Sequence, residues 1–161
     1  MKAAASLLYL REEELTDGVE LFFFAGRDFG RALDERLAQL DLGRAHYRAL
    51  HFVARHPALP VSDLLSILGI TKQSLSRVVR SLTSGGYLAQ TQGARDRRQR
   101  LLKLTPKGQQ LEMELGALQR ARFAKAYRQA GPEAVAGFRQ VLSGLLADQE
   151  RAGVLRLIAK R

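Results

Sequence analysis

The segment from Thr71 to Gly86 restricts the fold more than any other part of the chain, because it carries two opposite stripes at helical spacing. Its apolar residues recur at i, i+3, i+4 and i+7, which indicates one buried helix face. Thr71 is suited to cap this helix and Gly85-Gly86 to end it. The apolar stripe is Leu75, Val78, Val79 and Leu82, and the polar stripe is Lys72, Gln73, Ser76, Arg77 and Arg80.

A shorter helix is predicted before this segment and two strands after it. Ser62 is placed to cap the shorter helix, and Gly69-Ile70 forms a tight turn between the helices. Residues 87–91 and 100–104 have the pattern of strands, with an exposed hairpin tip over residues 92–99. This order of elements is typical of a winged helix-turn-helix, a fold whose second helix enters the major groove of DNA.

Helical patterns flank this central region on both sides. One long helix is predicted from Asp17 to Gln39 and another from Arg44 to Arg55. Thr105-Pro106 begins a helix that extends to about Gln129, and a last helix follows Gly131-Pro132. The predicted fold is therefore mostly α, with about six helices and a small β-hairpin wing.

Apolar residues near both ends of the chain exceed what one compact centre would bury, so they predict association of two copies. The last helix has a 3-4-3 apolar spacing like a coiled-coil seam. For the aromatic run Phe22-Phe23-Phe24, the alternative is a ligand-binding pocket, but core and dimer packing is favoured. The predicted dimer contacts are Phe22, Phe138, Leu142 and Leu145.

Positive charge is concentrated in the amphipathic helix and the hairpin. The chain has a net charge of +10, which attracts polyanions. Between Thr71 and Lys107 there are nine basic residues and one acid, so this stretch carries +8. An anionic membrane surface or an acidic partner would fit the total equally well, but the concentration favours a shaped nucleic-acid surface.

The residue types at the start of the amphipathic helix suit base recognition. In the major groove, Arg and Lys pair with guanine and Gln pairs with adenine. A helix N-terminus also favours a nearby phosphate. The predicted DNA contacts of this helix are Thr71, Lys72, Gln73, Ser74, Ser76, Arg77 and Arg80.

The hairpin tip presents arginines, which suit the narrow, strongly negative minor groove of A·T-rich DNA. Asp96 stands among them, and our hypothesis is that it holds one guanidinium in a bidentate pair. The alternatives are a plain turn residue for Asp96 and a solvated loop for the arginines. The predicted contacts are Arg95, Asp96, Arg97, Arg98 and Arg100.

Other chemistries lack the residues that they need. The chain has no cysteine, which excludes disulfides, thiolate metal sites and thiol redox switches. His46, His51 and His56 are five residues apart and spiral around a helix, so structural or surface roles are favoured over a metal site. No catalytic triad, phosphate loop or metal-ligand spacing stands out, so we expect neither a cofactor nor enzyme activity.

The N-terminal residues, Met1 to Leu10, are predicted to be an arm or a first helical turn rather than a signal peptide. Glu12-Glu13-Glu14 is interpreted as a solvated helix start. No stretch approaches the roughly 18 apolar residues of a membrane span. We therefore expect a soluble, cytoplasmic protein with no membrane partner.

Several motifs in the right order resemble the wing of the MarR family of transcriptional regulators. A hydrophobic pair follows the glycines, Asp-x-Arg stands at the tip, and Leu-x-Leu-Thr-x-x-Gly leads into the next helix. These motifs are Tyr87-Leu88, Asp96-Arg97-Arg98 and residues 102–108. The resemblance covers about Arg44 to Gly108, and residues 43–46 and 70–75 are similar to one proteobacterial group within the family.

The resemblance implies a homodimer whose terminal helices intertwine and whose two lobes bind a pseudo-palindromic operator in double-stranded DNA. Arg98 corresponds to the wing arginine that enters the minor groove, Asp96 to the acid that braces the wing, and residues 71–77 to the start of the recognition helix. The expected organisation is a single domain over 1–161. Within it, 44–108 form the DNA-binding lobe and 1–40 with 109–161 form the helical dimerisation region.

Many members of the family bind a small phenolic or aromatic ligand, so the resemblance makes an aromatic effector a candidate partner. Members that sense oxidation through cysteine are no guide to a chain without cysteine. The sequence leaves open whether the protein represses or activates genes. Alternative functions are a winged-helix module for RNA or protein, an enzyme that acts on nucleic acid, and a non-specific architectural DNA-binding protein.

Overall fold

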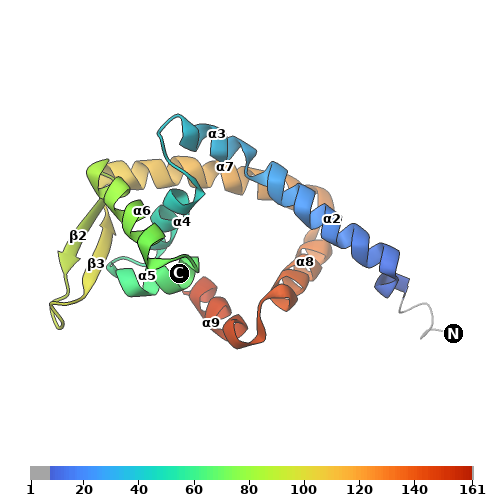
Figure 1. The fold of residues 1–161 in the computed structure, drawn as a ribbon. Coiled ribbons are helices and arrows are strands. Elements are labelled where there is room, and N and C mark those ends of the chain that lie inside the picture. Colours follow the sequence, from blue (N-terminus) through green and yellow to red (C-terminus); the bar gives the residue numbers. More distant parts are fainter. Residues whose placement is uncertain (1–7, 161) are drawn as a thin grey trace. The chain divides into compact units, whose positions relative to one another are not determined.

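The computed structural model describes residues 8–160 and divides the chain into two compact units, residues 1–43 and residues 44–161. Each unit is described by itself, with the element labels of Figure 1. Most of the expected N-terminal arm, residues 1–7, lies outside the described residues.

The first unit contains the 3-10 turn η1 (Leu8–Leu10) and the helices α2 (Glu12–Phe29) and α3 (Arg31–Ala38). The prediction of one helix from Asp17 to Gln39 was wrong at its start and in its continuity. The helix begins earlier because three glutamates in its first turn suit the positive end of the helix dipole. It is interrupted at Gly30, since glycine costs about 1 kcal/mol relative to alanine inside a helix.

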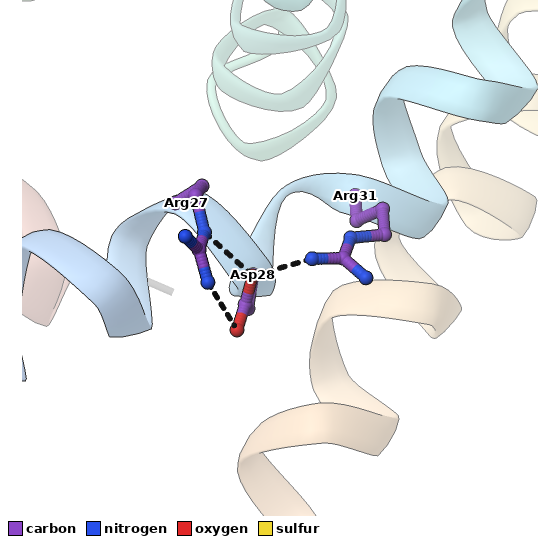
Figure 2. Close-up of polar contacts among 3 residues, drawn as sticks. All are labelled: Arg27, Asp28 and Arg31. Carbon is purple, nitrogen blue, oxygen red and sulfur yellow. Dashed lines mark hydrogen bonds and ion pairs between the residues drawn. The ribbon is translucent and has the colours of Figure 1, made fainter.

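A small ionic cluster spans the interruption at Gly30 (Figure 2). Asp28 Oδ1 accepts hydrogen bonds from Arg27 Nε at 2.9 Å and from Arg31 Nη2 at 2.7 Å. The hydrogen bond from Arg27 lowers the pKa of Asp28, and the same bond raises the pKa of Arg27. Because these side chains are exposed, the cluster contributes little to stability.

The second unit begins with α4 (Arg44–Arg55), β1 (Leu59–Pro60), α5 (Val61–Leu68) and α6 (Lys72–Ser84). The helix α5 ends at Gly69, whose φ of 60° is left-handed and suits glycine. The prediction that Ser62 caps α5 was wrong. The helix starts two residues earlier than a Ser62 cap would allow, with Pro60 at the cap position, and the Ser62 hydroxyl donates to Asp63 Oδ1 at 3.2 Å.

The hairpin is confirmed, but it belongs to a three-stranded sheet. Strands β2 (Leu88–Gln92) and β3 (Arg100–Leu104) are antiparallel, with Leu88 opposite Leu104 and Gln92 opposite Arg100. The strand β1 pairs with the other edge of β3, placing Leu59 opposite Leu102. A two-residue strand that contains proline shows no alternating pattern, which is why the sequence did not predict it.

Three helices follow the sheet: α7 (Pro106–Ala130), α8 (Pro132–Leu145) and α9 (Asp148–Ala159). The predicted last helix is broken between α8 and α9, where Leu146 is extended. The Arg151 side chain stabilises this corner by donating to the carbonyls of Ser143 and Leu146. The chain then turns back, so that α9 lies beside α5 in Figure 1, and Arg55 of α4 donates to the carbonyl of Ile158.

The core of the second unit joins the helix-turn-helix to the sheet and to α7. Its largest fully buried side chains come from α4, α5, α6, β3 and α7 and are Leu50, Val53, Leu64, Leu75, Leu82, Leu102 and Leu115. Burial of each such leucine contributes about 1.5–3 kcal/mol relative to leaving it exposed. This packing fixes which face of α6 is buried and which is free. Over residues 8–160, none of the helices has the length and apolarity needed to cross a membrane.

Candidate nucleic-acid interface

The helix α6 presents one polar face to solvent and buries the opposite face. Leu75, Val78, Val79 and Leu82 are at most 6 % exposed, as the apolar stripe predicted. All of the polar side chains predicted for DNA contact on this helix are exposed. They are Lys72, Gln73, Ser74, Ser76, Arg77 and Arg80, together with the capping residue Thr71.

Thr71 caps the N-terminus of α6. Thr71 Oγ1 accepts a hydrogen bond from the Ser74 backbone N–H at 3.1 Å and donates to Ser74 Oγ at 2.9 Å. This arrangement satisfies one of the free amides of the first turn and leaves the positive end of the helix dipole in solvent. An anion such as a backbone phosphate is favoured there.

The tip of the wing (residues 88–104) has an internal hydrogen-bond scaffold. The Gly93 amide donates to the Gln99 carbonyl at 3.0 Å, and the Gln99 amide donates to the Asp96 carbonyl at 3.1 Å. A Cβ atom at Gly93 would lie 2.7 Å from the Asp96 carbonyl oxygen, so the tip requires glycine at this position. The tip is therefore a shaped turn.

Asp96 takes the alternative role given by the sequence, that of a turn residue. Its Oδ1 accepts a hydrogen bond from the Arg98 backbone N–H at 2.9 Å, a local turn interaction. The ion pairs found among residues 8–160 include none between Asp96 and an arginine, so the bidentate hypothesis was wrong. The short side chain of Asp96 reaches a backbone amide two residues away more easily than it reaches the mobile guanidinium of an arginine. The guanidinium groups of the wing tip therefore stay exposed. These are Arg95, Arg97, Arg98 and Arg100.

The structure brings basic residues of the helix and of the wing to one surface. A groove of about 630 Å³ runs between α5, α6 and the strands of the wing. Lys72 and Arg80 of α6 line it together with Arg100 of β3. Residues separated by up to 28 positions thus share one cationic face, which is the juxtaposition that the charge distribution predicted.

His51 of α4 and His56, which directly follows this helix, have structural surroundings. His51 Nδ1 lies 3.2 Å from Glu112 Oε1 of α7, which links the two helices. His56 Nε2 is shielded from solvent and has no hydrogen-bond partner among the described residues. Burial lowers the pKa of His56 below its ordinary value of 6.5, and the neighbouring Arg55, Lys160 and His51 lower this pKa further.

The residues predicted for dimer contact lie mostly on exposed apolar faces. Phe22 is 63 % exposed on α2, and Phe138 and Leu145 are 40 % and 66 % exposed on α8, while Leu142 is partly buried. Val141, which the 3-4-3 spacing left out, is 64 % exposed. Phe138 also packs within the chain, with its ring centroid 6.3 Å from that of Phe123 on α7.

These elements define the class of the protein. A winged helix-turn-helix has a capped, exposed recognition helix, a tight turn before this helix and a basic hairpin after it. The sequence model of the MarR family matches residues 40–99. The HTH-type transcriptional regulator PetP of Rhodobacter capsulatus is 52 % identical over 141 residues, which cover 88 % of this chain and 85 % of that protein. The chain belongs to the MarR family of transcriptional regulators.

Solved structures agree with this fold. A mutant of MarR from E. coli in complex with operator DNA superposes with a TM-score of 0.67 at 21 % identity, covering 87 % of this chain and 99 % of that one. The protein NadR in complex with 4-hydroxyphenylacetate gives a TM-score of 0.67 at 22 % identity, covering 77 % and 88 % of the two chains.

Proposed function

We propose that this protein binds a pseudo-palindromic operator as a homodimer and regulates transcription from it in the cytoplasm. In each subunit, α6 enters the major groove and the wing reaches the adjacent minor groove with Arg98. The observation that carries this proposal is the cationic face shared by α6 and the wing, since its exposed side chains are of the types that recognise base edges and phosphates.

Two exposed apolar faces support the homodimer. On α2, Leu15, Val19 and Phe22 follow each other at i, i+4 and i+7, and each is more than half exposed. On α8, Phe138, Val141 and Leu145 form a row at i, i+3 and i+7. Continuous apolar rows of this kind are unusual on a monomer and are typical of protein interfaces. We assign both rows, with the surrounding residues 1–40 and 109–161, to the dimerisation region.

Three similar proteins support the DNA target and the effector. The structure of the MarR mutant with operator DNA has the same fold, and PetP is named as a transcriptional regulator. NadR was solved with 4-hydroxyphenylacetate, an aromatic acid, so we propose a small aromatic molecule as the effector class. Whether binding represses or activates transcription follows from the position of the operator in the promoter.

The function is tested by in vitro selection of bound duplexes from a random pool. A consensus with two-fold symmetry, with half-sites about one helical turn apart, is expected for a dimer of winged helices. A single unsymmetrical motif would contradict the dimer, and the absence of any enriched sequence would indicate an architectural protein. Stronger binding to structured RNA than to the selected duplex would reassign the cationic face to RNA.

A further inference from the structure

Lys107 is part of the basic stretch that follows α6, and its side chain is exposed, but its ammonium is bonded to the protein itself. Its Nζ donates to the Gly85 carbonyl at 2.7 Å and lies 4.5 Å from the centroid of the Tyr87 ring. Gly85 is the residue at which α6 ends. A cation at this point suits the negative end of the helix dipole and the face of the aromatic ring.

Thr105 adds three hydrogen bonds at the same place. Its hydroxyl donates to the Gly86 carbonyl at 2.6 Å and accepts from the Gly108 amide at 3.0 Å. The Thr105 amide also donates to the Tyr87 carbonyl at 3.1 Å. Thr105 thus caps α7 and at the same time connects it to the chain that leaves α6.

Gly108 completes this contact. A Cβ atom there would overlap the backbone carbonyl of Tyr87, so α7 and the start of the wing touch through their main chains. We call these residues the wing-root joint: Gly85, Gly86, Tyr87, Thr105, Lys107 and Gly108. Three elements meet in it, namely the end of α6, the start of β2 and the start of α7.

We propose that Lys107 is a positioning residue for DNA recognition, which fixes the wing and α7 to the end of the recognition helix and does not bind phosphate. This inference rests on the proposed function, because it assumes that α6 and the wing engage one DNA site. A specific site needs both elements at a fixed separation, whereas loose electrostatic binding does not. Loss of Lys107 therefore weakens binding to the operator more than binding to random DNA.

The test compares Lys107→Met with Lys72→Met, which removes a cation from the exposed start of α6. Affinity is measured by fluorescence anisotropy over a salt series, for the selected duplex and for a scrambled duplex of equal length. For Lys107→Met we expect about a fivefold loss on the selected duplex, little loss on the scrambled one and an unchanged salt slope. For Lys72→Met we expect the slope to fall by about 0.9, the effect of one phosphate contact.

A reduced salt slope in Lys107→Met, with equal losses on both duplexes, would identify Lys107 as a phosphate contact and overturn the proposal. Unchanged affinity for both duplexes would overturn it as well. If wild-type protein itself does not distinguish the duplexes, the proposed function fails, independently of Lys107.

A second pair of variants probes the joint without DNA. Thr105→Val removes the hydroxyl, whereas Thr105→Ser keeps it. Amide hydrogen exchange at Tyr87 and Gly108 should accelerate in Thr105→Val and in Lys107→Met, and should stay near wild type in Thr105→Ser. Wild-type exchange in Lys107→Met would show that the ammonium does not hold the joint, and would contradict the proposal.

Discussion

At the residue scale, the role of each charged side chain on the cationic face depends on whether its polar atoms are already bonded within the protein. Asp96 uses its carboxylate to bind the Arg98 amide, and Lys107 uses its ammonium to bind the Gly85 carbonyl. The arginines of the wing tip remain exposed. The exposed arginines are available to DNA, whereas Asp96 and Lys107 shape the surface that presents these arginines.

Arg98→Ala should weaken operator binding by about 1–3 kcal/mol, roughly fivefold to 150-fold, because a guanidinium in the minor groove is lost. The dimer should persist, since the wing tip is remote in sequence from both apolar rows. A gel-shift titration measures the affinity. Arg128→Ala, which removes an exposed arginine of α7, serves as the control. Equal affinities for wild type and Arg98→Ala would refute the assigned role.

Gln73→Ala and Arg77→Ala should change which sequence is preferred. Both side chains are exposed near the start of α6, where bidentate contacts to adenine and guanine distinguish bases by about 1–3 kcal/mol each. Repeating the selection with each variant should relax one symmetric pair of positions. Equal losses on selected and random duplexes would instead show that these residues touch only phosphate.

His56 should make the folded protein sensitive to mild acid. Because its pKa is lowered in the folded state, the unfolded chain takes up a proton first as the pH falls below about 6.5. The free energy of unfolding should therefore decrease below this pH, down to the pKa of the folded state. Urea unfolding at pH 7.5 and pH 5.5 measures the difference, which should be smaller in His56→Gln. An identical pH dependence in the variant would rule out His56 as the source.

At the element scale, the sequence was sufficient wherever a cap, a breaker and a periodic stripe agreed. The bounds of α4 and α6 and the capping roles of Thr71 and Thr105 were predicted from such signals. The breaks at Gly30 and Leu146 were not, because a helical apolar pattern continues across both. The strand β1 and the ionic cluster at Asp28 depend on contacts and local geometry that no periodic pattern contains.

The exposure of the residues proposed for DNA contact was predictable, but the hydrogen bonds among their neighbours were not. Exposure of the polar face of α6 follows from the opposite apolar stripe, since one buried face leaves the other free. The joint around Lys107 was missed because its bonds link residues about 20 positions apart, and by composition Lys107 is one more basic residue. The glycine at position 108 was the available signal, as it stands inside a helix where alanine would ordinarily be preferred.

Gly108→Ala should destabilise the protein, although alanine favours helices by about 1 kcal/mol over glycine. The added methyl group would overlap the Tyr87 carbonyl and force α7 away from the root of the wing. Gly153→Ala in α9 is the matched control, because a Cβ there meets no atom within 4 Å. Thermal unfolding should give a lower midpoint for the first variant and an equal or higher one for the second. A stabilised Gly108→Ala variant would contradict the close contact.

At the scale of the whole molecule, we propose that operator recognition and subunit association depend on different parts of the chain. The cationic face lies within residues 44–108, and the apolar rows lie on α2 and α8. Two lobes held at a fixed spacing bind a symmetric site far more tightly than two independent lobes, because the second contact becomes intramolecular. Loss of the dimer should therefore resemble loss of DNA binding.

Phe22→Asp should convert the dimer into a monomer, since it places a carboxylate on the apolar row of α2. Light scattering after size-exclusion chromatography measures the mass, and Glu20→Gln on the same helix serves as the control. The operator affinity of the variant should fall by at least about tenfold, while its circular dichroism stays near wild type. A dimeric Phe22→Asp protein would place the subunit interface elsewhere.

The central claim is that α6 occupies the major groove while the wing occupies the minor groove of the same operator. Methylation interference with dimethyl sulfate tests both grooves at once, because it modifies guanine N7 in the major groove and adenine N3 in the minor groove. We predict interference at guanines within two symmetric half-sites and at adenines beside them, with the adenine signal lost in Arg98→Ala. Interference confined to one groove, or without two-fold symmetry, would contradict the account.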